Sequence, residues 1–155
     1  MNRKKIFWLG VCTFLLSATS TQLFAQEEIV KKRKDLMQAQ NAAVKAITKA
    51  AEEKDYATID TKAKEIMGTT ENIFALFPKG SLVDKSRAHP DIWVKSDDFK
   101  NRAANTRKVA EALSKAAAAK NEAEVTAKVK DLGNTRDGSC GDCHKLYRAD
   151  FRKDS

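Results

Sequence analysis

The chain has 155 residues, of which 42% are hydrophobic and 32% charged, with six Gly and two Pro. A chain of this length forms one ordinary domain and buries a core without disulfide bonds. The composition excludes a disordered chain except at its ends, and its Ala, Lys and Glu content favours helix. The formal net charge of +8 does not indicate nucleic-acid binding, because Lys and Arg alternate with Asp and Glu and no aromatic-basic surface is evident.

The N-terminus predicts a secretory signal peptide over residues 1–25. Three basic residues at positions 3–5 precede an apolar run over residues 6–16 and a small, polar segment over residues 17–25, which is the order of a signal sequence. The apolar run is about half as long as a bilayer span, so we expect cleavage rather than a membrane anchor. A retained anchor and a lipidated Cys12 are the alternatives, and Val11 before that Cys argues against the second.

Cleavage after Ala25 leaves a mature chain of 130 residues that begins at Gln26. Three basic residues are removed with the signal and no acidic one, so the formal charge falls from +8 to +5. We therefore expect a periplasmic protein without stable membrane insertion, whose mildly basic surface favours encounter with acidic partners.

Two helices are predicted in the first half of the mature chain. Apolar residues recur every three or four positions over residues 27–53 and again over residues 56–77, as on one face of a helix. Pro78 and Gly80 end the second helix. The predicted inward residues are Ile29, Arg33, Leu36, Met37, Gln40, Val44, Ile47 and Ala51, then Ile59, Ala63, Ile66, Met67, Thr70, Ile73, Phe74 and Phe77.

Residues 78–95 are expected to form an irregular connection, and two more helices follow it. Ser96 is a suitable N-cap for the third helix, and the fourth begins near Asn121, where Glu124 resembles a capping box. Gly133 and Gly138 interrupt the fourth helix before its pattern resumes at residue 140, so we expect a bulge or break there. The predicted inward residues are Phe99, Ala103, Thr106, Ala110, Leu113 and Ala117, then Val125, Val129 and Leu132.

Together these segments predict an all-α fold: an antiparallel four-helix bundle with one longer crossover loop between its second and third helices. The predicted domains are the signal peptide, residues 1–25, and the bundle, residues 26–155. Apolar stripes of this kind more often form a plain core than line a cofactor pocket. They therefore predict the bundle but do not by themselves indicate a cofactor.

The chemistry is carried by residues 140–144, Cys-Gly-Asp-Cys-His. This spacing lets the thiols of Cys140 and Cys143 add to the two vinyl groups of one haem while the imidazole of His144 reaches the iron. Export agrees with this interpretation, because c-type haem is attached outside the bacterial cytoplasm. The sequence therefore predicts one covalently attached haem c per chain.

Three other interpretations of this run remain open. A thioredoxin-like dithiol needs a strand before the first Cys, and none is predicted. A closed zinc site needs four ligands, and the mature chain adds only the distant His89 to the run. A disulfide between the two cysteines would close a loop too short to stabilise much, and would leave His144 unexplained.

The position of the run near the C-terminus, followed by Tyr147 and Arg148, resembles the cytochrome c-prime, or class II cytochrome c, family of four-helix bundles. Residues 77–81 (Phe-Pro-Lys-Gly-Ser) and 90–93 (Pro-Asp-Ile-Trp), with Phe99 beyond them, resemble that family's crossover loop and third helix. Relatives commonly have a Gly about three residues before the first haem Cys, whereas here the nearest glycines lie seven and two residues before Cys140.

The resemblance also implies a ligand on the other side of the iron. In the family the distal position lies on the first helix, four residues after a basic residue, and here that register runs from Arg33 to Met37. Members with Met at this place resemble low-spin electron carriers, whereas members with a non-ligating residue keep five-coordinate iron. A thioether is a soft ligand that favours ferrous iron. Without the resemblance, Met37 is better interpreted as core packing than as a ligand.

The expected function is therefore that of a periplasmic monohaem electron carrier, with His144 as proximal and Met37 as distal ligand. The alternative is a five-coordinate protein that binds nitric oxide or carbon monoxide, if Met37 does not ligate. The sequence shows no nucleophile–base pair, so no enzymatic activity is predicted. The expected partners are redox proteins, and the resemblance implies a possible homodimer through the first two helices. Phe74, Trp93 and Tyr147 are expected to pack in the core or around the haem, and Arg148 to lie near its edge or in solvent.

Overall fold

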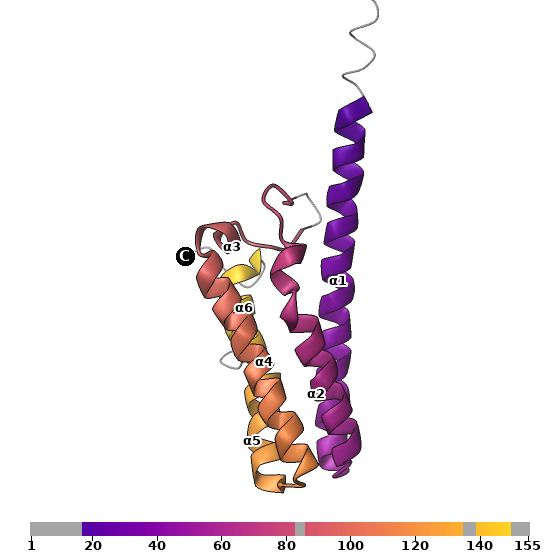
Figure 1. The fold of residues 1–155 in the computed structure, drawn as a ribbon, viewed down its shortest axis with the longest axis vertical. Coiled ribbons are helices and arrows are strands. Elements are labelled where there is room, and N and C mark those ends of the chain that lie inside the picture. Colours follow the sequence, from indigo (N-terminus) through magenta and orange to yellow (C-terminus); the bar gives the residue numbers. More distant parts are fainter. Residues whose placement is uncertain (1–16, 83–85, 135–138, 150–155) are drawn as a thin grey trace, which may run out of the picture.

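The computed structural model describes residues 17–82, 86–134 and 139–149. In these ranges the chain forms helices and no β-strand, as Figure 1 shows, which confirms the predicted all-α class. The α-helices are α1 (Ser17–Glu52), α2 (Tyr56–Glu71), α3 (Asp91–Val94), α4 (Ser96–Ala118), α5 (Glu122–Gly133) and α6 (Ser139–Tyr147), and η1 (Ile73–Leu76) is a 3-10 helix. None of the helices in the described ranges is both long and apolar enough to cross a membrane.

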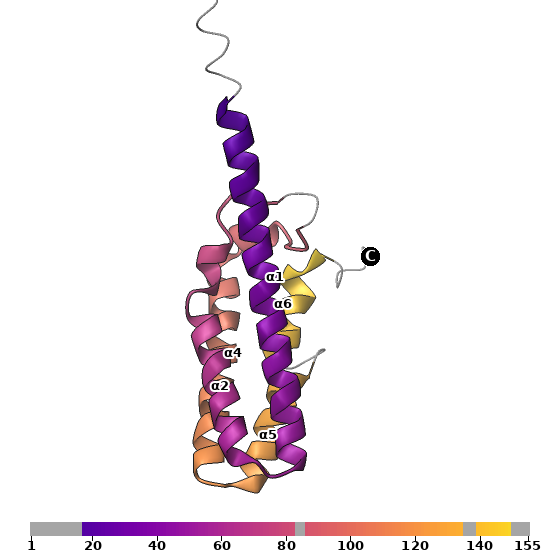
Figure 2. The same cartoon turned by 90° about the vertical axis from the view of Figure 1, so that its right-hand side faces the viewer.

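The long helices pack as an antiparallel bundle. α1 and α2 form one pair and α4 and α5 the other, and the two tight turns lie at the same end of the molecule (Figures 1 and 2). At these turns Lys54 and Lys120 have positive φ angles of 55° and 52°, a conformation that commonly ends a helix. The N-cap side chains of Asp55 and Asn121 then accept hydrogen bonds from the backbone N–H of Thr58 and Glu124, at 3.1 and 3.2 Å.

The fourth rod of the bundle is built from two helices, α5 and α6, which follow one another along α4 (Figure 1). α5 ends at Gly133 and α6 begins at Ser139. Asn134 has an extended backbone, with φ −66° and ψ 115°, so the helix is interrupted directly after Gly133 as predicted. Gly138 lies outside the described residues. The consequence of the break is that the run of residues 140–144 lies on a short helix of its own, separate from the long helix that precedes it.

Two predicted helix ends were wrong, and the predicted character of the crossover connection and the predicted cap at Ser96 also need correction. α1 begins at Ser17 rather than near Glu27, because residues 17–26 contain neither Gly nor Pro to stop a helix. The second helix ends at Glu71 instead of continuing to Phe77, and the chain tightens into η1 beyond Asn72. The connection over residues 78–95 is not wholly irregular, because it includes α3. Ser96 is the first residue of α4, and its N-cap, Lys95, makes no side-chain cap.

The core divides into two clusters of buried side chains. One lies toward the tight turns and includes Ile47, Ile59, Ile66 and Leu113, each at most 1% exposed. The other lies toward the crossover loop and α6, and contains Ile73, Phe77, Ile92, Phe99, Ala103 and Tyr147. The predicted inward residues of α4 are all buried. Ile92 packs against the core as expected, at 1% exposed.

Candidate functional site

A cavity of about 500 Å³ is enclosed by residues of α1, α4 and α6 and of the crossover loop. Cys140, Cys143 and His144 line it from α6, and Met37 lines it from α1. The fold thus brings residues that are separated by most of the bundle sequence to the wall of one cavity. In Figure 2 α6 lies at the level of the middle of α1, but it packs on α4 and α5, so the cavity lies between α6 and α1.

The two cysteines are free thiols, each partly buried on the wall of the cavity. They lie three residues apart, so consecutive turns of α6 present them on the same face. Burial raises the pKa of the Cys143 thiol to about 12, and it also raises the pKa of Cys140. A reactive dithiol of the thioredoxin type depends on a lowered thiol pKa. The environment of these cysteines is the opposite, which disfavours that interpretation.

The wall formed by α1 carries Met37 one turn beyond Arg33, a cation that is only 6% exposed. Arg33 Nε donates to the carbonyl oxygen of Leu76, and its Nη1 atom donates to the carbonyl oxygen of Ser81 at 3.1 Å. Its guanidinium also lies over the ring of Phe77, with 4.4 Å from Cζ to the ring centroid. Burial lowers the pKa of Arg33, but an arginine keeps its charge in a protein. These contacts fix the crossover loop to the helix that bears Met37.

The lining of the cavity fits a large, flat, mostly apolar group that carries acidic substituents. Its surface is mainly apolar, with contributions from Val30, Val44, Phe99 and Leu132. The described lining residues include the cations Arg33, Lys34, Arg87 and Arg148 and no Asp or Glu. A haem has this character, since an apolar macrocycle bears two propionates. The volume also falls in the usual range for a ligand site, about 300–1,000 Å³.

The remaining candidates of the sequence are divided between the cavity and its surroundings. Tyr147 and Arg148 line the cavity, whereas Phe74 and Trp93 line a smaller depression on the other side of Phe77. His89 does not line the cavity, and its Nδ1 accepts a hydrogen bond from the backbone N–H of Asp91 at 3.2 Å. Across the described residues no three side chains of His, Cys, Asp or Glu gather to hold a metal ion, so the zinc alternative gains no support there.

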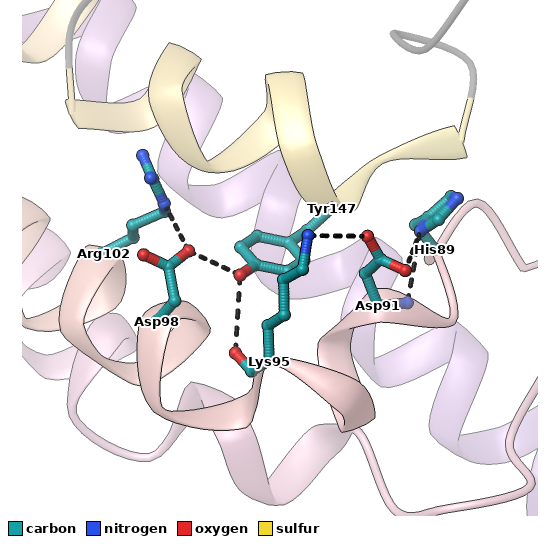
Figure 3. Close-up of polar contacts among 6 residues, drawn as sticks. All are labelled: His89, Asp91, Lys95, Asp98, Arg102 and Tyr147. Atoms are coloured by element: carbon teal, nitrogen blue, oxygen red, sulfur yellow. Dashed lines mark hydrogen bonds and ion pairs between the residues drawn. The ribbon is translucent and has the colours of Figure 1, made fainter. Parts of the chain in front are cut away.

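One feature of the site was not found from the sequence. The hydroxyl of Tyr147 donates to Asp98 Oδ2 at 2.5 Å, and the same oxygen accepts from Arg102 Nε at 2.8 Å (Figure 3). Asp98 and Tyr147 are 49 positions apart in the chain. Only the packing of α6 on α4 brings them together, and the sequence showed Asp98 only as an acid in the first turn of a helix.

Comparison with known proteins identifies the family to which this chain belongs. The family model described as Cytochrome C' matches residues 28–148, which include the whole described bundle apart from its first helical turns and Ala149. This chain belongs to the cytochrome c-prime family. Membership implies a haem c cofactor, and members of this family carry haem rather than act as typical enzymes. The antiparallel four-helix bundle predicted for the chain is the fold of the family.

Individual relatives agree with the family assignment. The chain is 36% identical to cytochrome c-554 of Cereibacter sphaeroides over 105 residues, 64% of this chain and 65% of the relative, just under two thirds of its length. It is 29% identical to cytochrome c' of Rhodospirillum rubrum over 151 residues, 95% of this chain and 99% of the relative. The crystal structure of cytochrome c' from Thermochromatium tepidum superposes with a TM-score of 0.68 at 25% identity, covering 80% of this chain and 97% of that one.

Proposed function

We propose that the protein is an exported monohaem cytochrome that carries single electrons in the periplasm. Cys140 and Cys143 hold the haem through two thioethers, His144 is the proximal ligand of the iron, and Met37 is the distal ligand. The observation that carries this proposal is the shared cavity. The only mature thiols, the adjacent imidazole and the Met of the family register all line it, although they come from opposite ends of the bundle sequence.

The residues of the chain explain how such a carrier would work. A bound haem would supply the Fe(III)/Fe(II) couple, and its potential would depend on the axial ligands and on how far the mostly apolar cavity buries it. The Met37 thioether favours the ferrous state. The cations that line the cavity offset the negative charge of propionates.

Export is the second part of the proposal. We infer that residues 1–25 are removed and that the mature chain begins at Gln26, which leaves the bundle from residue 28 onward intact. Ala25, after which we expect cleavage, is a small residue of the kind found at such sites, and charged residues begin just beyond it at Glu27. Redox proteins with acidic surfaces are the expected partners of the mature chain, with its net charge of +5.

The test is the mass and the visible spectrum of the protein exported by a bacterium that attaches haem c. We expect the mass of residues 26–155 plus one haem, a haem-linked peroxidase signal after denaturing electrophoresis, and sharp low-spin bands on reduction. The matched control is Cys140→Ala with Cys143→Ala, which should show neither signal. A bare polypeptide mass for the parent would overturn the proposal. Attached haem that is high-spin in both oxidation states would instead favour the gas-binding alternative and leave Met37 as packing.

A further inference from the structure

The helix that carries the proposed proximal ligand is unusually dependent on its neighbours. α6 has nine residues, and a helix that short has little stability in water on its own. It bears Cys140, Cys143 and His144, so whatever holds α6 also sets the direction of the imidazole. Its last residue, Tyr147, lies three positions after His144 and is 4% exposed, which makes it a natural anchor.

Tyr147 holds α6 to α4 through two kinds of contact. Its ring packs edge-on against Phe99, with 5.1 Å between centroids and 88° between planes. Its hydroxyl donates to Asp98 Oδ2 at 2.5 Å, and Arg102 Nε donates to the same oxygen at 2.8 Å. In Figure 3 the phenol points from α6 directly at the carboxylate on α4. A hydrogen bond to a charged acceptor is stronger and more directional than a neutral one.

We propose that Tyr147 and Asp98, with Arg102, are positioning residues that fix α6 on α4 and so set the orientation of His144 toward the haem. This inference rests on the proposed function, because it requires His144 to be an axial ligand. The groups keep the charge states that the contact needs. Arg102 and then Tyr147 lower the pKa of Asp98, and burial followed by Asp98 raises the pKa of Tyr147. The donor therefore stays protonated and the acceptor stays charged near neutral pH.

The opposing explanation is that Tyr147 only fills the core. The substitution Tyr147→Phe separates the two, because it keeps the ring against Phe99 and removes only the hydroxyl. We expect haem to remain attached, the g-values of the ferric haem in electron paramagnetic resonance to shift, and the amides of α6 to exchange hydrogen roughly tenfold faster. Ferric g-values report the axial field in both low-spin and high-spin haem, so this measurement does not depend on Met37.

Asp98→Asn removes the charge of the acceptor but keeps an oxygen that can accept from the Tyr147 hydroxyl, so it should shift the g-values in the same sense but less than Tyr147→Phe. Combined with Tyr147→Phe it should add little, because the hydroxyl that it affects is already gone. Two matched controls lie away from the cavity. Tyr56→Phe removes a phenol hydroxyl that has no hydrogen-bond partner among the described residues. Asp60→Asn removes a carboxylate that, like Asp98, accepts from a hydroxyl, Ser114 Oγ at 2.5 Å, and from a cation, Lys64. Both controls should leave the g-values unchanged.

Unchanged g-values and unchanged α6 exchange in Tyr147→Phe, with haem attached, would overturn the inference and leave Tyr147 as core packing. Equal shifts of the g-values in Asp60→Asn would also overturn the inference. Loss of a similar contact away from the cavity would then have the same effect, through a general loosening of the bundle. Absence of covalent haem from the parent protein, by contrast, would overturn the proposed function itself. The failure of the inference and the failure of the function are thus told apart by the parent alone.

Discussion

At the scale of single residues, we propose that Met37 decides whether the iron is six-coordinate and hence which kind of cytochrome this is. It lines the cavity one turn beyond Arg33, whose contacts with Leu76 and Ser81 hold the crossover loop against α1. The backbone around Met37 is therefore well restrained, and a change of this side chain acts on the cavity more than on the helix. The thioether is half-buried, as expected for a group that faces a space large enough for a haem.

Met37→Ala should open the distal side of the iron without releasing the haem. If the thioether leaves the iron in about 0.1–10% of parent molecules, carbon monoxide should bind the ferrous variant roughly 10 to 1,000 times faster than the parent. Loss of the soft ligand should also lower the reduction potential. Stopped-flow mixing and a redox titration measure these effects. Met67→Ala is the matched control, because Met67 packs in the other core cluster, and equal rates in both variants would show that Met37 is packing.

At the scale of elements, periodicity and caps located the helices but not all of their ends. The stripes of α2 and α4 were predicted because burial and helical spacing coincide there, as at Ile59, Ile66 and Leu113. The end of α2 was missed because the apolar pattern continues past Asn72, where the backbone turns to φ −116° and ψ 22°. Asn72 is itself a residue type common just after a helix, but the apolar residues beyond it, which pack in the second core cluster, continue the helical spacing and hide the end.

Within the site, too, local sequence patterns predict some features, whereas others depend on the packing of distant segments. Cys140, Cys143 and His144 are proposed from spacing alone, because attachment chemistry requires neighbouring residues. Met37 needed the family register, since one helical Met resembles any other. The contact between Tyr147 and Asp98 joins α6 to α4, and no local pattern predicts which side chains of two helices will meet.

The cap of α5 gives a test at this scale. Asn121→Ala removes the acceptor of the Glu124 N–H and should lower the free energy of unfolding by about 1 kcal/mol. For a domain of this size that corresponds to a melting temperature roughly 4 °C lower. Asn105→Ala is the control, because Asn105 is exposed within α4, where Ala is the better helix former and should stabilise by about 0.5 kcal/mol. Thermal unfolding followed by circular dichroism measures both, and equal losses would refute the capping role.

At the scale of the whole molecule, the two core clusters differ in what completes them. The cluster toward the tight turns joins α1, α2, α4 and α5 directly, through Ile47, Ile59, Leu113 and Val125 among others. The cluster toward α6 includes Phe77, Phe99 and Tyr147, which also line the cavity. Most of the first cluster therefore packs on itself, with only Leu132 among its buried residues lining the cavity, whereas more than half of the second cluster packs around the space that we assign to the haem.

This asymmetry predicts an apoprotein that loosens at one end. Cys140→Ala with Cys143→Ala prevents attachment, so the stabilisation that a bound ligand gives the native state is lost. A ligand at a hundred times its dissociation constant already contributes about 2.7 kcal/mol, so the melting temperature should fall by roughly 10 °C or more. Hydrogen exchange should accelerate first in α6 and around Phe99, while amides near Ile47, Ile59 and Leu113 stay protected, because their packing partners remain in place.

The parent sequence expressed in the cytoplasm without residues 1–25, and so without haem attachment, is the control and should match the variant. Uniform loss of protection along the chain would contradict a self-sufficient core at the tight turns, and an unchanged melting temperature would show that the bundle is complete without its cofactor.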